Sequence, residues 1–334
     1  MSADLLVATA EDVYAAISMQ DGIGLMRKGF VALANGRIDQ PLRTIIKSPL
    51  SSGFLGLMPA CVDDPDIYSI PVYGAKIGTL FPENTKIGKD PHQGSVMLMS
   101  GITGETLAIL DACSVTALRT AAVTGLATSL LANPEASTLT LFGTGHQAFW
   151  QLQAIAAVRT LTKVFVVSRD IGNAQKFAHD AGNRNTFAVE ATDNVQSALA
   201  ASDIVVTATN SAVPVLRNEW IKPGTHITAM GASTPSYCEI DGATMAAATL
   251  FVDLAASTKR ESGEYLNAMR DGYLNKDSPL TELSEVIVHP EKGRTSKDQV
   301  TLFKSLGLAF EDVIVAAELH RRHVSANAGI RVKP

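Results

Sequence analysis

The stretch TLTLFGTGHQAFWQLQAIAAVRTLTKVFVVSR, residues 138–169, determines the fold class predicted for this chain. An apolar run leads into the glycine turn GTG at 143–145, and a helix-length segment with small Ala148 in its first turn follows. A second apolar run, VFVV, ends at the polar pair Ser168-Arg169. This order is typical of a dinucleotide-binding βαβ unit, whose first glycine permits the turn and whose second lets the backbone approach the pyrophosphate. We therefore expect the phosphates at the N-terminus of this helix.

The end of the second strand bears on which dinucleotide binds. An acidic residue there would bind the ribose 2′-OH of NAD and repel a 2′-phosphate. Ser168 and Arg169 instead offer a hydroxyl and a guanidinium, which both suit a 2′-phosphate. Two alternatives stay open: Asp170, the next residue, is the ribose ligand, or Arg169 is only a surface charge. We expect NADP, with NAD as the alternative.

Composition excludes several classes of protein. The chain has 334 residues, enough for two domains, with 46% hydrophobic and 18% charged residues. A net charge of −5 gives no basic surface for nucleic acid. The sequence has no apolar run of membrane-spanning length, and its start lacks the pattern of a signal peptide. Without CxxC spacing or a His cluster, we expect no metal site and read the three cysteines as reduced core residues of a cytoplasmic protein: Cys61, Cys113 and Cys238.

The periodicity of the chain predicts an α/β fold. Strands and helices alternate in the middle of the chain, which favours a Rossmann-type, doubly wound parallel sheet. The strands expected there are 139–142, 164–167, 187–190, 204–207, 226–230 and 250–252, with helices at 171–181 and 194–201. Earlier residues predict a helix over 11–34, a helix over 114–132 and an antiparallel sheet of short strands at 43–46, 53–59, 68–70, 74–79, 94–99 and 105–110.

The end of the chain falls outside this alternation. Residues 298–324 have the pattern of one long amphipathic helix, which we expect to return to the first part. The predicted arrangement is a nucleotide domain inserted into a mixed α+β substrate and dimerisation domain. Its predicted boundaries are 1–118 for the first part of the substrate domain, 119–305 for the nucleotide domain and 306–334 for the returning helix.

Several further motifs stand in one order along the chain. They are PLRT at 41–44, YGAK at 73–76, DPHQG at 90–94, LRTAA at 118–122, GTGHQA at 143–148, GASTP at 231–235 and FKSLG at 303–307. Together they resemble the ornithine cyclodeaminase/μ-crystallin family over essentially the whole chain. The resemblance implies a homodimeric, two-domain NAD(P) protein that acts at the α-carbon of amino or imino acids.

The resemblance also implies residue roles. Arg43 and Lys76 would face the substrate, Arg119 would lie where the substrate carboxylate meets the nicotinamide, and Leu306 would line the substrate. The cofactor contacts expected from the glycine turn and the resemblance together are Arg119, Thr120, Gly143, Thr144, Gly145, His146, Gln147, Ser168, Arg169, Thr207, Met230 and Ser305.

Elementary chemistry supports these roles. Hydride exchange at an α-carbon requires a fixed carboxylate, which arginine binds bidentately. It also requires a proton near the imine nitrogen, and Lys76 is the candidate donor because nearby cations and desolvation would lower its pKa. The alternative is that Lys76 and Arg43 are ordinary surface cations. His92 either assists proton transfer or only forms hydrogen bonds within its loop.

Two departures separate this chain from diamine-processing members. Ser233, included in the predicted catalytic set, replaces the aspartate of cyclodeaminases and related alanine dehydrogenases, and Gly56 stands where cyclodeaminases have a glutamate. The function expected first is NAD(P)H-dependent reduction of Δ1-pyrroline-2-carboxylate or Δ1-piperideine-2-carboxylate to the L-amino acid. The alternatives are an alanine dehydrogenase-like or acyclic imino-acid reductase, an ornithine cyclodeaminase, and a non-catalytic protein that binds NADP and a small ligand.

Overall fold

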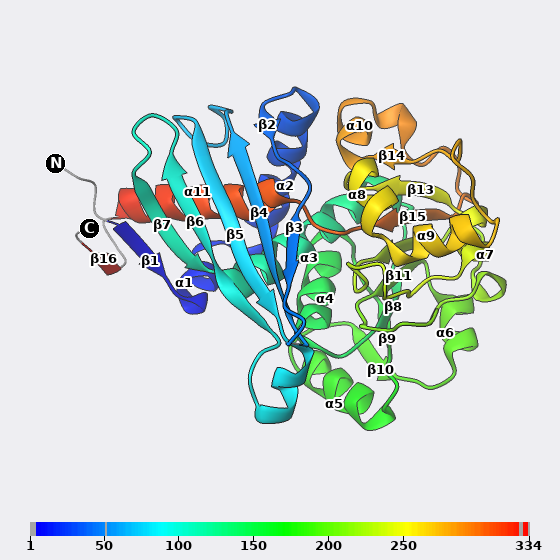
Figure 1. The fold of residues 1–334 in the computed structure, drawn as a ribbon. Helices are drawn as coiled ribbons and strands as arrows, with labels where there is room; N and C mark the ends of the chain where they lie inside the picture. Colours follow the sequence, from blue (N-terminus) through cyan, green and yellow to red (C-terminus); the bar gives the residue numbers. More distant parts are fainter. Residues whose placement is uncertain (1–4, 51, 327–329, 333–334) are drawn as a thin grey trace. The chain divides into compact units, whose positions relative to one another are not determined.

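The computed structural model describes residues 5–50, 52–326 and 330–332, and the chain divides into two compact units. Unit 1 contains the chain up to Thr120 and from Leu308 onward, and unit 2 contains residues 121–307. The first boundary falls inside helix α3 (Ala112–Leu131). Each unit has its own sheet (Figure 1).

Unit 2, whose residues are all described, is built on a parallel sheet in the order β10-β9-β8-β11-β12-β15-β13-β14. The strands are β8 (Thr138–Phe142), β9 (Lys163–Val167), β10 (Ala188–Ala191), β11 (Ile204–Thr207), β12 (His226–Ala229), β13 (Thr249–Val252), β14 (Thr281–Glu282) and β15 (Thr301–Lys304). Strand order runs outward from β8 in both directions, which confirms the doubly wound, Rossmann-type fold.

Helices alternate with these strands. They are α4 (His146–Val158), α5 (Ile171–Gly182), α6 (Val195–Ala201), α7 (Gly242–Ala247), α8 (Ala255–Glu261), α9 (Gly263–Arg270) and α10 (Leu283–Val288), with short 3₁₀ turns η2 (Asn218–Trp220) and η3 (Pro290–Lys292). Parallel strands covered on both faces are apolar along their whole length, and β11 accordingly has four fully buried residues, IVVT.

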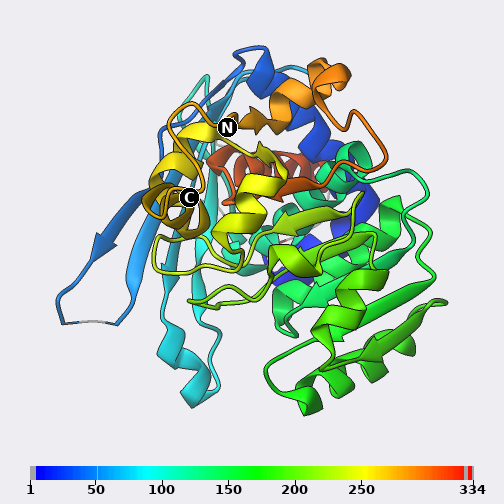
Figure 2. The same ribbon diagram turned by 90° about the vertical axis from the view of Figure 1, so that its right-hand side faces the viewer.

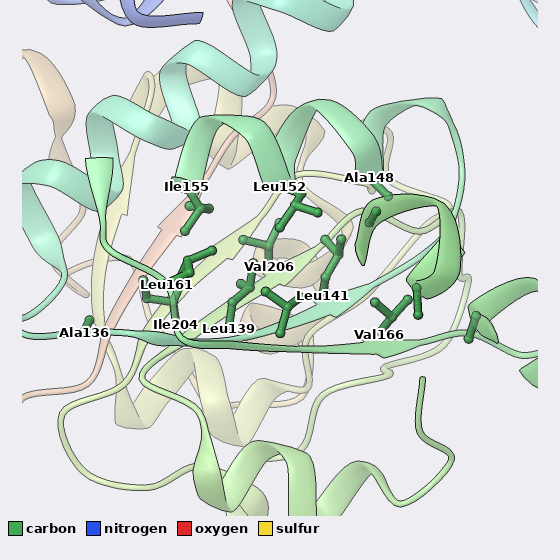
Figure 3. Close-up of a cluster of buried hydrophobic side chains, with 14 of the residues drawn as sticks. Ala136, Leu139, Leu141, Ala148, Leu152, Ile155, Leu161, Val166, Ile204 and Val206 are labelled. Atoms are coloured by element: carbon green, nitrogen blue, oxygen red, sulfur yellow. The ribbon is translucent and has the colours of Figure 1, made fainter. Parts of the chain in front are cut away.

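The core beside β8 explains the close packing of α4. Leu139 and Leu141 lie beneath Leu152 and Ile155 of α4, and all four are fully buried (Figure 3). Ala148, one turn before Leu152, is also fully buried against the same cluster. A small residue there lets the first turn of α4 approach the sheet, so the helix N-terminus lies at the end of β8.

Unit 1 contains a sheet in the order β16-β1-β7-β6-β5-β4-β2, with β3 paired to β4. Its described elements are β1 (Leu5–Ala8), α1 (Ala10–Ala16), α2 (Met19–Ala34), β2 (Ile38–Asp39), β3 (Thr44–Lys47), β4 (Phe54–Val62), β5 (Val72–Leu80), η1 (Pro82–Ile87), β6 (His92–Ser100), β7 (Thr106–Asp111), α11 (Ala309–Ala326) and β16 (Ile330–Val332). Neighbouring strands are antiparallel except for β1 and β7, which are parallel. Figure 2 shows the β3–β4 hairpin, in blue, extending away from the rest of this sheet.

Helix α11 covers one face of the unit 1 sheet and also packs against α2 (Figure 1). The approach is close at Gly74 of β5, where a Cβ would lie 2.7 Å from a methyl group of Val313. A second close approach is at Gly29 of α2, where a Cβ would lie 2.5 Å from the ring of Phe310. Glycine at both positions therefore lets α11 lie directly on the sheet and on α2.

Three of the predicted elements are wrong. Residues 68–70 form an irregular segment with a bend at 69–70, not a strand. The helix expected over 11–34 is two helices, because Ser18 accepts a hydrogen bond from the backbone of Asp21 and starts α2 with a capping box. The helix expected over 298–324 begins only at residue 309: residues 301–304 are strand β15, since a short apolar run fits a buried strand as well as a helix.

The predicted burial of the cysteines is also wrong in part. All three are free thiols, and Cys238 is buried, but Cys61 and Cys113 are half-buried. Cys61 belongs to β4, whose residues alternate between buried and half-buried positions in its second half, and it falls on the half-buried side. Alternation along a strand that is covered on one face accounts for this placement.

Candidate functional site

The glycine turn after β8 has the geometry that a pyrophosphate requires. Gly143 has a φ of +108°, and a Cβ there would lie 2.4 Å from the carbonyl oxygen of Ala208, so only glycine fits. Gly145 is the N-cap of α4 and makes no side-chain capping bond, and no atom lies within 4 Å of where its Cβ would be. A ligand can therefore approach the backbone at the N-terminus of α4 beside Gly145, where the helix dipole suits an anion.

Buried polar atoms near this turn also fit a dinucleotide. The side-chain oxygens of Gln147, in α4, and Thr207, at the end of β11, are buried and have no hydrogen-bond partner in the part of the chain that the structure describes. Buried polar atoms are normally satisfied, so both fit a bound polar group. A cavity of about 290 Å³, lined by Thr144, His146 and residues of α5, adjoins the turn.

Four predicted cofactor residues follow neighbouring strands in sheet order. Gly143 follows β8, Thr207 ends β11, Met230 follows β12 and Ser305 follows β15. Because all these strands are parallel, their carboxyl ends meet at one edge of the sheet, where ligands bind in doubly wound folds. The structure therefore brings these four residues to a common edge of unit 2.

Three polar residues follow β9, and the structure places them in different surroundings. Ser168 is half-buried and Arg169 is exposed. The Oδ1 atom of Asp170 accepts hydrogen bonds from the backbone N–H groups of Gly172, at 2.7 Å, and Asn173, at 3.4 Å. Asp170 is thus the N-cap of α5.

Glu239, which the sequence analysis did not single out, joins two loops at this edge of unit 2. Its Oε1 accepts from the N–H and the hydroxyl of Thr209, both at 2.7 Å, and its Oε2 accepts from the N–H groups of Gly231, at 2.8 Å, and Ala232, at 3.2 Å. Burial raises the pKa of Glu239, while the Lys304 charge and the bonds from Thr209 oppose this rise. The carboxylate thereby fixes the loops after Thr207 and before half-buried Ser233.

Lys304 and Asp253 hold the neighbouring backbone. The Lys304 ammonium, fully buried at the end of β15, donates to the Ala232 carbonyl oxygen at 2.6 Å and to Glu264 at 3.2 Å. The Oδ2 of Asp253 accepts from the N–H groups of Leu306, at 2.5 Å, and Gly307, at 2.7 Å. Loop 305–307 is therefore held in place by a buried carboxylate.

In unit 1, a buried ion cluster surrounds Lys76. The Lys76 Nζ lies 2.9 Å from Oδ2 of Asp312 and donates to Oδ1 of Asp312 at 3.1 Å and to the hydroxyl of Thr116 at 3.2 Å. Arg119 pairs with Glu311 through Nη1 at 2.8 Å and with Asp312 through Nε at 3.3 Å. Both acids lie in the first turn of α11, where the helix dipole stabilises anions.

Burial and the charges around Lys76 shift its pKa. Burial and the positive charge of Arg119 lower the pKa of Lys76 to about 8, while Asp312 opposes the shift. Arg43 also lies close enough for its charge to lower this pKa. The cluster thus places the cations Lys76, Arg119 and Arg43 near the two carboxylates of α11. These cations are suited to a substrate carboxylate.

The structure does not place His92 beside Lys76. In the register of β5 and β6, Lys76 pairs with Val96, whereas His92 pairs with Leu80, four residues farther along. That offset corresponds to about 13 Å along the strands. The His92 carbonyl oxygen accepts a bond from the thiol of Cys113 at 2.8 Å. This bond involves the His92 backbone, so both roles considered for its imidazole stay predictions.

Glu311, Asp312 and Glu239 are the site residues that sequence reasoning missed. The available signal was the pair Glu311-Asp312 within an otherwise apolar stretch, AFEDVIV, since charged residues are rarely buried unless they are paired. Thr120, expected to contact the cofactor, is buried at the boundary of unit 1.

Comparison with known proteins identifies the family. The model of the ornithine cyclodeaminase/mu-crystallin family matches residues 3–327. The chain belongs to the ornithine cyclodeaminase/mu-crystallin family. Within this family it is similar to a Δ1-pyrroline-2-carboxylate reductase from Bacillus cereus strain ZK / E33L, with 32% identity over 330 residues that cover 98% of this chain and 100% of the relative.

Two solved structures of similar proteins cover nearly the whole chain. One is Thermococcus litoralis Δ1-pyrroline-2-carboxylate reductase in complex with NADH and L-proline, with 33% identity, a TM-score of 0.93, and coverage of 98% of this chain and 100% of that one. The other is an archaeal alanine dehydrogenase dimer with bound NAD, with 30% identity, a TM-score of 0.90 and 99% coverage of each chain.

Six of the seven motifs on which the family resemblance rests lie at two places, one in each unit. PLRT, YGAK and LRTAA supply the cations of the unit 1 cluster, while GTGHQA, GASTP and FKSLG lie at the edge of the unit 2 sheet described above. No group of three or more His, Cys, Asp or Glu side chains among the described residues is arranged to hold a metal ion. Across residues 5–50, 52–326 and 330–332, no helix has the length and apolar character needed to span a membrane.

Proposed function

We propose that this chain reduces a small cyclic imino acid, Δ1-pyrroline-2-carboxylate or Δ1-piperideine-2-carboxylate, to the L-amino acid with NAD(P)H. The observation that carries this proposal is the buried Lys76, with a pKa lowered to about 8, beside Arg119 and Arg43. The similarity to two Δ1-pyrroline-2-carboxylate reductases supports the choice of substrate.

Each cation has a defined part in the proposed reaction. Arg43 and Arg119 hold the substrate carboxylate, because a guanidinium can bind both carboxylate oxygens. The Lys76 ammonium gives its proton to the imine nitrogen, since a pKa of about 8 leaves it protonated at neutral pH yet acidic enough for general acid catalysis. The nicotinamide cofactor supplies hydride to the α-carbon when bound. Burial of Lys76 also keeps competing water from its Nζ.

The cofactor in this proposal is NADP, with NAD as the alternative. The residues that would hold it are those of the glycine turn, 143–147, with Thr207, Met230 and Ser305 at the same sheet edge. Exposed Arg169 and half-buried Ser168 would bind the 2′-phosphate, because the side chain of Asp170 is directed toward the first amides of α5.

A homodimer in the cytoplasm completes the proposal. The sheet face opposite α11 presents exposed apolar residues: Ile46 is 58% exposed, Tyr73 is 50% exposed and Ile77 is 43% exposed. Tyr73 and Ile77 point away from the face that contains Lys76 because side chains alternate along β5. An apolar patch of this kind favours association, and the similar archaeal alanine dehydrogenase is a dimer.

The three free thiols agree with a reducing compartment.

An assay of NADPH oxidation over a substrate panel tests the function. The panel contains cyclic imino acids of two ring sizes, and pyruvate with ammonia or with methylamine. We expect ammonia-independent oxidation with a cyclic imino acid and formation of L-proline or L-pipecolate. Oxidation only with pyruvate and ammonia would assign the second candidate, an alanine dehydrogenase-like activity, which the similarity to the archaeal enzyme favours. NADPH binding without turnover of any member of the panel would assign a binding role.

A further inference from the structure

Asp312 is the one carboxylate of the unit 1 cluster that contacts two cations through described bonds. Its Oδ1 accepts from Lys76 Nζ at 3.1 Å and from Arg119 Nε at 3.3 Å, and its Oδ2 lies 2.9 Å from the same Nζ. The three residues come from β5, α3 and α11. A single carboxylate therefore joins three elements that have no local connection in the sequence.

We propose that Asp312 is a positioning residue of the imino-acid reduction: it holds Lys76 and Arg119 in a fixed relation and keeps the Lys76 ammonium charged until it gives up its proton. The inference rests on the proposed function for the identity of the reaction. Asp312 itself would contact neither substrate nor cofactor, and it acts through Lys76 and Arg119.

The hydrogen-bond geometry leaves Lys76 with one donor for a substrate. An ammonium group has three N–H donors. Oδ1 of Asp312 and the Thr116 hydroxyl accept two of them, while Oδ2 of Asp312, although 2.9 Å from Nζ, is not oriented to accept a third. A lysine side chain otherwise rotates among many rotamers, so two fixed acceptors on the same ammonium direct the third N–H.

The charges that face Lys76 give Asp312 its electrostatic role. Arg119 of α3 and Arg43 before β3 both disfavour the charged ammonium, as does burial itself. The thiol of Cys113, also on α3, is near enough for Lys76 to lower the thiol pKa, although burial and nearby acids raise that pKa to about 11, so the thiol is neutral at neutral pH. Asp312 is the anion that opposes the lowering of the Lys76 pKa.

Glu311 offers a matched comparison. It is equally buried in the same turn of α11, and its Oε2 pairs with Arg119 Nη1 at 2.8 Å. Its hydrogen bond and ion pair join it to Arg119, whereas Asp312 contacts both Arg119 and Lys76. A loss of negative charge at either residue disturbs the cluster, but only the loss at Asp312 removes an acceptor from Lys76.

The test measures the pKa of Lys76 in the substrate-free protein. In protein labelled at lysine ¹³Cε, the Lys76 resonance is assigned by its loss in Lys76→Arg and followed by NMR against pH in substrate-free protein. We expect Asp312→Asn to lower the Lys76 pKa by about one unit or more and Glu311→Gln to lower it by less than half as much. The alkaline limb of kcat/KM for the cyclic imino acid should move by the same amount in Asp312→Asn.

Asp312→Glu separates charge from position and guards against an unfolded asparagine variant. It keeps the anion but displaces it by one methylene, so the Lys76 pKa should stay near the wild-type value while kcat falls about tenfold. An unchanged Lys76 pKa in Asp312→Asn, or equal shifts in Asp312→Asn and Glu311→Gln, would overturn the inference. If the wild-type protein reduces no cyclic imino acid, the proposed function fails, whereas the NMR titration still decides whether Asp312 controls Lys76.

Discussion

The carboxylate of Asp170 accepts a hydrogen bond from the backbone N–H of Gly172 at 2.7 Å, one residue after exposed Arg169. This bond caps α5 and engages Oδ1 of Asp170, so the side chain is directed toward the first amides of α5. An NAD-specific site requires a carboxylate that is available to the ribose hydroxyls. Because Asp170 is directed toward α5, the proposed function assigns the discrimination between the two cofactors to Arg169.

Arg169→Ala should raise KM for NADPH about tenfold or more and leave KM for NADH nearly unchanged. The physical reason is the loss of a charge-assisted contact to the 2′-phosphate, which NADH lacks. Steady-state kinetics with both cofactors measure the effect. Arg184→Ala, in the cavity beside the turn, serves as the control for a general loss of positive charge. Equal changes in KM for NADPH and NADH would show that Arg169 does not bind the phosphate.

Arg43→Lys should reduce kcat/KM for the cyclic imino acid even though the charge is preserved. A lysine cannot form the two parallel bonds of a guanidinium with a carboxylate, and the expected loss is about tenfold to a hundredfold. Inhibition by pyrrole-2-carboxylate, a planar carboxylate analogue of the substrate, should weaken in parallel. Arg37→Lys, on an exposed turn of the same unit, is the control. Unchanged kinetics and inhibition in Arg43→Lys would remove Arg43 from the substrate site.

Lys76→Met should lower kcat by about 10²–10⁴-fold, the usual range for a positioned acid–base group. Because the pKa of Lys76 is lowered to about 8, its acid form is lost as the pH rises through that value, and the wild-type rate should fall there. The variant should lack this alkaline limb. NADPH affinity, measured by fluorescence, should change little, since the expected cofactor contacts lie mainly in unit 2. A variant with near-native turnover and the same pH profile would assign the proton to another donor.

Ornithine should not be deaminated by this protein. An α-ammonium that enters beside Lys76, Arg43 and Arg119 needs a further anion, because Asp312 and Glu311 are paired with Lys76 and Arg119, and Ser233 and Gly56 are uncharged. The measurement is ammonia release and proline formation from ornithine in the presence of NAD. Stoichiometric production of both would contradict the assignment. Ser233→Asp is the informative variant: if Ser233 faces the substrate, as the resemblance implies, the new carboxylate should lower activity with the cyclic imino acid by repelling its carboxylate.

Glu239→Gln should destabilise the protein by about 1–3 kcal/mol, since the amide NH₂ would face backbone donors that the carboxylate now satisfies. Thermal unfolding should show a clear decrease in Tm. Glu190→Gln is the matched control: its ion pair with Lys163 at 2.9 Å is on the surface, with Glu190 54% exposed, so the loss should be at most about 1 kcal/mol. Equal changes in Tm for the two variants would contradict a special role for Glu239.

Local features of the sequence determined the nucleotide unit. The positive φ of Gly143 and its close approach to Ala208 exclude every side chain at this position. Because only glycine meets such a requirement, the turn can be found from the sequence of a few residues. The continuous apolar runs of the parallel strands are likewise local, because burial on both faces removes alternation. The motifs that contain Arg43, Lys76 and Arg119 can also be found in the sequence, since each is a short contiguous segment.

Only the tertiary structure decided the rest, because it depends on partners far apart in the chain. Periodicity alone predicts a helix for residues 301–304, because four residues are too few to distinguish a helix from a buried strand. Their pairing with β12 and β13 makes them a central strand of the unit 2 sheet. Asp312 and Lys76 are 236 residues apart. A buried carboxylate and a buried ammonium are stable because they pair with each other, so the role of neither can be predicted from its own segment. Packing of α11 on the unit 1 sheet brings the two side chains together.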